Sequence, residues 1–243
     1  MMLDIDRNKA RSSKDEYHQN ELNIALDSNN FANFLPRIRV GEKVLDIGCG
    51  AGQTLIAACP LRIPGEGGGC VTCARTDDAC HGWACGVDID QDALRLGRAW
   101  SDVLHLQHAS AEHLPYNDKQ FDIVISRVCL YLVDMQAALS EIRRVLRPGG
   151  RIWFTLHRFS MVRQQLTGKN WRGRIFLTYV VLNGLLFHLT LRTLALFNRR
   201  EYWQTSSAMR RVLKKYQFEK INCAIKGNTL IVSASLGVSL EEA

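Results

Sequence analysis

The feature that most constrains this 243-residue chain is a short apolar run that ends in three closely spaced glycines. Residues 43–47 (KVLDI) predict a buried strand, Gly48, Gly50 and Gly52 follow it, and residues 53–58 favour a helix. Glycine permits a tight turn and lets a ligand lie against bare backbone, with the amino end of the helix facing it. The sequence therefore predicts a ligand site at the carboxyl end of this strand.

Strand and helix patterns alternate over about 150 residues. The predicted strands are 43–47, 85–89, 103–107, 121–126, 151–156, 220–224 and 228–234, and the predicted helices are 53–58, 91–101, 135–146 and 206–216. Such alternation is typical of a doubly wound, mostly parallel α/β sheet. Residues 1–37 predict an N-terminal helical segment, and residues 38–243 form the main domain, with insertions at about 60–84 and 158–201.

Acidic residues at the ends of two strands indicate what the ligand is. Asp46 lies two residues before the first glycine, where a carboxylate repels a pyrophosphate but can hold a cationic group. Gln53 stands where dinucleotide-binding turns need a small residue. Asp88 ends the second strand, where a carboxylate can accept hydrogen bonds from both ribose hydroxyls. A nucleoside with a cationic end is therefore favoured over NAD or FAD.

Four ordered motifs resemble those of class I S-adenosylmethionine-dependent methyltransferases. They are VLDIGCGAGQT, GVDID, SAEHLPYNDKQFDIVIS and LRPGGRIWFT, within about residues 38–158. The sequence is most similar to the small-molecule branch that includes the ubiquinone/menaquinone-type methyltransferases. The resemblance implies S-adenosylmethionine as cofactor and a seven-stranded, Rossmann-like methyltransferase sheet with two additions, a Cys-rich insertion and an apolar helical lid.

The resemblance also implies a set of cofactor-binding residues. They are Asp46, Gly48, Cys49, Gly50, Gly52, Asp88, Ile89, Ala111, Glu112 and Arg127. In this family pattern Asp46 reaches the methionine ammonium group, Asp88 binds the ribose hydroxyls and Arg127 lies near the methionine end. Ser110 departs from the pattern, because the family often has Asp there to accept from the adenine amino group.

Methyl transfer from a sulfonium is an in-line displacement, so the protein mainly orients the reactants and excludes water. A general base is needed only when the acceptor carries a proton. The candidates are His157, His113 and Tyr131, and each of them is equally compatible with a packing or surface role. Residues 126–129 read Ser-Arg-Val-Cys, which lacks the signatures of enzymes that methylate nucleic-acid bases. Nucleic acid is therefore an unfavoured partner.

The first insertion is rich in cysteine. Its candidate metal ligands are Cys70, Cys73, Cys80 and Cys85, with Cys59 or His81 as possible replacements for Cys85. The first pair has the spacing of a structural zinc site, and the second pair is looser. The alternative is a flexible loop that carries free thiols.

The second insertion holds an apolar run of 17 residues, Ile175 to Leu191, that contains no charged side chain. Arginines flank it at positions 172, 174 and 192. The run is shorter than the roughly twenty residues that span a membrane. It predicts a lid over an apolar pocket or, alternatively, a peripheral membrane contact through residues 171–200. Either interpretation predicts a hydrophobic acceptor that is quinone-, lipid- or aromatic-like.

The net charge of +7 is unevenly distributed. Residues 151–243 carry 15 Lys and Arg against 4 Asp and Glu, so the basic excess surrounds the second insertion. Two other functions remain open: an RNA methyltransferase that uses this basic part, and a cofactor-binding protein without catalysis. The charged N-terminus, MMLDIDRNKARSSKDE, predicts no signal peptide, so we expect a cytoplasmic protein with reduced thiols, with or without membrane association.

Overall fold

A computed structural model of the protein describes residues 41–58, 84–100, 104–165, 171–196 and 199–238, together with residues 16, 35–36 and 38–39. The predicted N-terminal helical segment and most of the Cys-rich insertion therefore lie outside the described residues. The chain divides into two compact units, residues 1–109 and residues 110–243.

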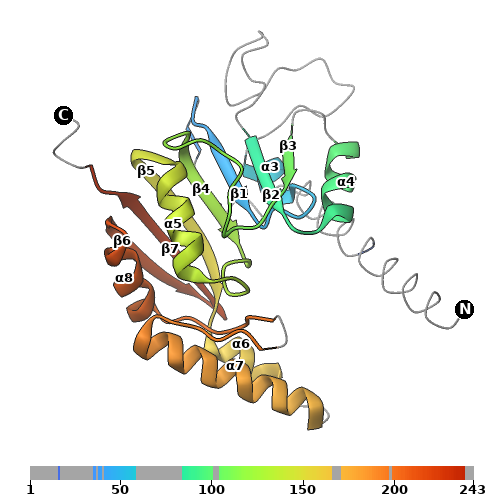
Figure 1. Ribbon diagram of the computed structural model, residues 1–243, viewed down its shortest axis with the longest axis vertical. Coiled ribbons are helices and arrows are strands. Elements are labelled where there is room, and N and C mark those ends of the chain that lie inside the picture. The colour runs from blue at the N-terminus through green and yellow to red at the C-terminus, as the bar shows by residue number, and fades with distance from the viewer. Residues whose placement is uncertain are drawn as a thin grey trace, which may run out of the picture. The chain divides into compact units, whose positions relative to one another are not determined.

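The described part of the first unit contains three parallel strands and two helices, in the order β1 (Val44–Ile47), α3 (Gln53–Ala58), β2 (Ala84–Asp88), α4 (Gln91–Trp100) and β3 (His105–His108) (Figure 1). Strand β2 lies between β1 and β3, with Leu45 opposite Cys85 and Gly86 opposite Leu106. All four residues of β1 are buried, as expected for a strand covered on both faces.

The second unit contains four strands and four helices. They are β4 (Phe121–Arg127), α5 (Met135–Val145), β5 (Leu146–His157), α6 (Phe159–Gln165), α7 (Trp171–Thr190), α8 (Ser206–Lys215), β6 (Phe218–Lys226) and β7 (Thr229–Leu236). Strand β5 pairs parallel with β4 and antiparallel with β7, and β6 pairs antiparallel with β7. Figure 1 shows α6 and α7 beyond the carboxyl end of β5.

The strand order is β3-β2-β1-β4-β5-β7-β6, which confirms the predicted seven-stranded, mostly parallel sheet with alternating helices. Most boundaries differ from the sequence prediction by one or two residues, and α6 is not predicted. Strand β5 begins at Leu146 and contains the Arg-Pro-Gly-Gly stretch that predicted a turn. That turn signal persists as a shift in the β4–β5 register and a positive φ at Gly149. Strand β3 begins at His105 rather than at Val103.

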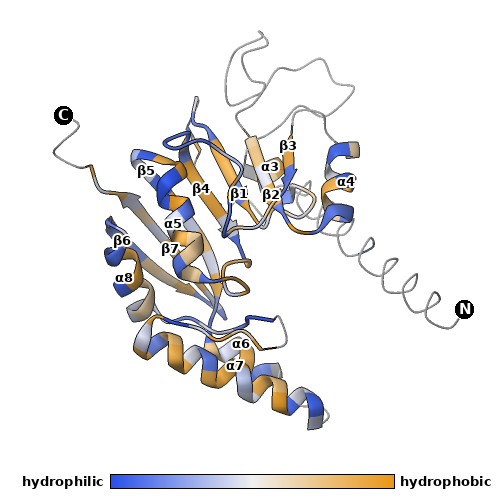
Figure 2. Ribbon diagram, in the orientation of Figure 1, coloured by the Kyte–Doolittle hydropathy of each residue, from blue (hydrophilic) through white to orange (hydrophobic). Residues whose placement is uncertain are grey.

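Helix α7 coincides with the apolar run of the second insertion and extends it toward the N-terminus. Figure 2 shows that the helix is hydrophobic along most of its length. Among the described residues it is the one helix that is long and apolar enough to cross a membrane, judged by length and composition alone. One face packs against α6, where Val162, Leu177 and Val180 form a small buried cluster.

Helix α4 approaches the glycine turn closely because its Gly97 has no side chain. A Cβ atom at this position would lie 2.5 Å from the carbonyl oxygen of Ala51 and 2.5 Å from a methyl carbon of Leu106. The carbonyl belongs to the glycine turn and cannot move without disturbing it. The packing of α4 thereby holds the turn in place.

We expect Gly97→Ala to lower the free energy of unfolding by about 1–3 kcal/mol, because overpacking exceeds the gain of up to about 1 kcal/mol in helix propensity. Chemical denaturation measures the change. Arg95→Ala is the matched control on the same helix, where the side chain is 67% exposed, and we expect it to stay within about 0.5 kcal/mol of wild type. A stabilised Gly97→Ala variant would contradict the close approach of α4.

Candidate active site

The glycine turn follows β1 directly and is held by backbone hydrogen bonds. The amides of Gly48 and Cys49 both donate to the carbonyl oxygen of Val87 in β2, at 2.8 and 3.1 Å. Gly48, Gly50 and Gly52 have φ angles of +73°, +55° and +85°. Residues other than glycine rarely adopt such backbone angles, so this turn depends on glycine at all three positions.

The Asp88 carboxylate lies at the end of β2 and contacts the same turn. One oxygen accepts from the amide of Gly50 at 2.8 Å, and the other accepts from the amide of Asp90 at 2.8 Å. A carboxylate offers about four lone-pair positions, so two backbone donors leave capacity for further hydroxyl groups. The structure therefore places Asp88 where it can shape the turn and also bind a diol such as a ribose.

Side chains around the turn fit a nucleoside. Ile89 follows Asp88 and is 73% exposed, which leaves an apolar surface free to pack against a flat base. Asp46 is fully buried within β1, and Cys49 is buried beside Gly86. A Cβ atom at Gly86 would lie 2.7 Å from the Cys49 sulfur, so Cys49 fills space between the turn and β2.

The remaining predicted cofactor residues belong to the second unit. Ala111 is buried, and Arg127 is the half-buried last residue of β4. A Glu112 oxygen accepts from the amide of Asp134 at 2.7 Å, so this side chain supports the start of α5. The Ser110 hydroxyl accepts from the amide of Glu112 at 3.2 Å. The adenine-binding role implied for these residues stays a prediction.

The structure brings two of the three candidate bases together. The rings of Tyr131 and His157 lie 4.3 Å apart, between the loop after β4 and the end of β5. Burial lowers the pKa of His157, so its imidazole is neutral at pH 7 and able to accept a proton. His113 lies in the loop that precedes β4, is exposed, and interacts with Glu141 of α5 instead.

Apolar side chains at the carboxyl ends of β4 and β5 were missed by sequence reasoning. Val128, Leu132 and Phe159 are 37%, 46% and 41% exposed. Val128 also has a φ of +56°, which is strained for a β-branched residue and is typical of functional sites. Its amide donates to the carbonyl oxygen of Thr155 at 3.0 Å, which holds it in this conformation. Only the fold reveals this strain, because nothing in the sequence marks Val128 as a residue with a positive φ.

A pocket of about 710 Å³ lies beside the carboxyl end of β5. The rings of Phe159 and Trp203 lie 5.2 Å apart on its wall, and Ile225 and Leu230 line another part. The buried oxygen of Gln204 has no hydrogen-bond partner and also lines the pocket. The other lining residues are polar or charged and include Arg158 and Arg163, so the pocket combines two aromatic rings with many polar groups.

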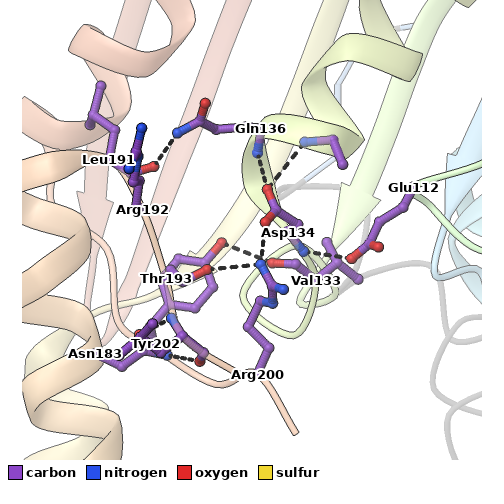
Figure 3. Close-up of polar contacts among 12 residues, drawn as sticks. Glu112, Val133, Asp134, Gln136, Asn183, Leu191, Arg192, Thr193, Arg200 and Tyr202 are labelled. Atoms are coloured by element: carbon purple, nitrogen blue, oxygen red, sulfur yellow. Dashed lines mark hydrogen bonds and ion pairs between the residues drawn. The ribbon is translucent and has the colours of Figure 1, made fainter. Parts of the chain in front are cut away.

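Residues 191–196 and 199–205, here called the strap, connect α7 to the loop between β4 and α5 (Figure 3). Arg200 of the strap forms an ion pair with Asp134, the residue that caps α5. The buried Tyr202 hydroxyl donates to the carbonyl oxygens of Leu130 and Val133, at 3.0 and 3.3 Å. Gln136 donates to the carbonyl oxygen of Leu191 at 2.8 Å. The strap therefore determines where α7 lies relative to the end of β4.

The predicted zinc site lies almost entirely outside the described residues. Cys70, Cys73 and Cys80 belong to the undescribed insertion, as do the alternatives Cys59 and His81. Cys85 is buried within β2. Within the described ranges, no group of three His, Cys, Asp or Glu side chains is placed to hold a metal ion. A zinc ion in this insertion stays a prediction.

The sheet topology and the glycine turn define a class of protein, the Rossmann-like α/β fold of methyltransferases. Comparison with known sequences is more specific. Residues 64–154 match the model of a family described as "Methyltransferase domain". This match covers less than half of the chain, and the resemblance to S-adenosylmethionine-dependent methyltransferases is confirmed.

Two curated relatives are enzymes of quinone biosynthesis by name. A demethylmenaquinone methyltransferase from Staphylococcus haemolyticus is 32% identical over 119 residues, which is 47% of this chain and 43% of the relative. A ubiquinone/menaquinone biosynthesis C-methyltransferase from Vibrio vulnificus is 36% identical over 115 residues, covering 47% of this chain and 40% of the relative. The chain thus spans less than half the length of these relatives.

Solved structures support the fold. A chain from a Haloferax volcanii complex of the Trm112 methyltransferase activator with a methyltransferase has a TM-score of 0.60 at 16% identity, covering 95% of this chain and 96% of that one. A SAM-dependent methyltransferase from Thermotoga maritima has a TM-score of 0.51 at 17% identity, with 90% of each chain covered.

The Asp134 carboxylate makes the strap and the start of α5 depend on pH. Burial alone would raise its pKa, but hydrogen bonds from the Ala137 amide and Arg200, and the charge of Arg200, outweigh burial and lower the pKa. A carboxyl group with a lowered folded pKa stabilises the protein above its unfolded value of about 3.9. That stabilisation is lost as the pH falls through the lowered folded pKa.

We expect Asp134→Ala to lower the free energy of unfolding at pH 7 by about 1–2 kcal/mol, because the α5 cap and the Arg200 ion pair are both lost. Urea denaturation at pH 7 and at about pH 3 measures the difference from wild type, which should shrink at the lower pH. Asp118→Ala is the control, since Asp118 also pairs with an arginine but is 72% exposed. Equal losses for both variants at pH 7 would contradict the role given to Asp134.

Proposed function

We propose that this protein transfers the methyl group of S-adenosylmethionine to carbon or oxygen of a hydrophobic small molecule. The observation that carries the proposal is the Asp88 carboxylate, which is bonded to the glycine turn beside the exposed Ile89. The methyltransferase family match agrees with this site. The cofactor, when bound, supplies an electrophilic methyl group.

The protein's own residues bind and orient the reactants. Gly48 is half-buried, whereas Gly50 and Gly52 are buried, so the turn would present mainly the backbone at Gly48 to the cofactor. Asp88 would accept hydrogen bonds from the ribose of the cofactor. This arrangement is built before the cofactor arrives, because backbone hydrogen bonds already hold the turn. Preorganisation of this kind lowers the entropic cost of bringing the reactants together.

The hydrophobic acceptor is supported by apolar groups at the carboxyl ends of β4 and β5. Val128, Leu132 and Phe159 present exposed apolar surface there, and the pocket beside β5 has aromatic walls. Acceptors in open α/β sheets bind at this edge. The relatives named for menaquinone and ubiquinone biosynthesis have acceptors of the same class.

The neutral His157 imidazole is the best-placed general base. An acceptor hydroxyl must lose its proton when its oxygen is methylated, and a neutral imidazole can accept that proton. The Tyr131 ring packs against the imidazole and limits its orientation. A carbon acceptor that is already activated would need His157 only for packing.

We expect Asp88→Ala to weaken S-adenosylmethionine binding roughly ten- to a hundredfold, the effect of losing a hydrogen bond to a charged group. Asp88→Asn keeps one acceptor oxygen for the Gly50 amide and separates a disturbed turn from lost ribose contacts. Isothermal titration calorimetry measures both variants. Asp92→Ala, an exposed change on α4, is the matched control. Affinities within about threefold of wild type for both Asp88 variants would refute the ribose assignment.

The reaction itself is tested with methyl-labelled S-adenosylmethionine and separate lipid, metabolite and RNA extracts. We expect label in an apolar product, identified by mass spectrometry, because the surfaces at the ends of β4 and β5 are apolar. Asp88→Ala is the negative control, and it should transfer little label at limiting cofactor. Label only in RNA would overturn the hydrophobic acceptor. Cofactor binding without any transfer would indicate a binding protein instead of an enzyme.

A further inference from the structure

Helix α7 exposes a row of large apolar side chains to solvent, interrupted by Thr178. Trp171, Ile175, Leu182, Leu185 and Leu189 are between 46% and 65% exposed. Their spacing of three, four and seven residues places them on one side of the helix. Only 28% of the most apolar window of this helix is buried. An exposed apolar surface of this length is unusual for a soluble protein and marks an interaction site.

Two polar side chains of the same helix point inward, whereas Arg172, Arg174, Thr178 and Thr190 are exposed. Asn183 is buried and its amide nitrogen donates to the carbonyl oxygens of Leu194 and Glu201, both at 3.0 Å. Its oxygen accepts from the amide of Leu194 at 2.8 Å, and Figure 3 shows Asn183 close to the strap. His188 contacts the Thr205 hydroxyl at 2.9 Å. The rest of the inward face is apolar, with Leu177, Val180 and Phe187 buried, so α7 is apolar on both its inward and its outward face.

Gly184 lies on this inward side and allows the strap to pack closely. A Cβ atom there would lie 2.2 Å from the indole nitrogen of Trp203, which donates to the carbonyl oxygen of Val181 at 3.2 Å. The inward face of α7 thus packs against the rest of the protein, and its polar groups form hydrogen bonds with protein groups. This excludes a free transmembrane helix as the role of α7 in this fold.

All Lys, Arg, Asp and Glu residues in the sequence around α7 are basic ones. Residues 142–200 contain 12 Lys and Arg and no Asp or Glu. Arg172 and Arg174 at the start of the helix and Arg192 after its end are exposed. The guanidinium of Arg172 lies 5.3 Å from the centre of the Trp171 ring, and tryptophan beside arginine is common at membrane interfaces.

We propose that the outward face of α7 binds the surface of an anionic lipid membrane, with the helix lying in the interface plane. Apolar side chains enter the lipid, while the flanking arginines contact acidic headgroups. A second copy of the chain fits this face less well, because it would bring arginines against arginines. The inference is independent of methyl transfer, and it would give a lipid-soluble acceptor a short path to the enzyme.

The full-length protein is tested by flotation with phosphatidylcholine vesicles that either contain or lack phosphatidylglycerol. We expect binding to the anionic vesicles, weak binding to the neutral ones, and release at high salt, which screens the arginines. Arg172→Gln and Arg174→Gln should each weaken binding about fivefold, as expected for one basic residue near an anionic surface.

The triple variant Leu182→Ser, Leu185→Ser, Leu189→Ser should lower vesicle affinity by roughly tenfold or more, because less apolar surface enters the lipid. Ile225→Ser on β6 is the matched control, since Ile225 is 56% exposed but lies outside α7. Circular dichroism melting shows whether each variant is folded. Since all three leucines are exposed, we expect unchanged melting temperatures.

Three results would overturn the proposal. The first is that the folded wild-type protein fails to bind anionic vesicles. The second is equal vesicle binding by the triple variant, together with a dimer in sedimentation that the triple variant abolishes, which would make this face a contact between two copies. The third is resistance of the membrane-bound protein to alkaline carbonate extraction, which would indicate a spanning helix.

Discussion

Asp134 is the residue on which the second unit most depends. Its side chain caps α5 and pairs with Arg200 of the strap, and its backbone amide donates to Glu112 in the loop before β4. Three segments therefore meet at this residue: α5 and the strap at its carboxylate, and the loop before β4 at its backbone amide. Because an acid at the amino end of a helix is also favoured by the helix dipole, one side chain satisfies several demands at once.

In the first unit, one carboxylate and two glycines determine the packing around the glycine turn. The Asp88 carboxylate accepts the Gly50 amide, and Gly97 and Gly86 give α4 and Cys49 room to pack around the turn. These contacts are all made between residues of the chain itself. The fold therefore fixes the turn, and ligand binding does not carry the entropic cost of ordering it.

The composition of helix α7 does not determine which of its faces is exposed. Its sequence is apolar enough for a lid, a membrane contact or a buried core helix. The strap engages Asn183 and Gly184, and this decides which face is left outside. The apolar row that stays outside is available to another partner, and the surrounding arginines indicate the charge of that partner.

The sequence alone determined the strands, the glycine turn and the acids at the strand ends, because hydrophobic periodicity and glycine requirements are local. It also placed the apolar helix within a few residues. It did not reveal the contact of Tyr131 with His157, the strain at Val128 or the partners of Asp134. These depend on pairings between residues that are distant in sequence, and many such pairings are compatible with the same local pattern. Only the tertiary structure selects among them, because burial and hydrogen bonding are satisfied together in one arrangement.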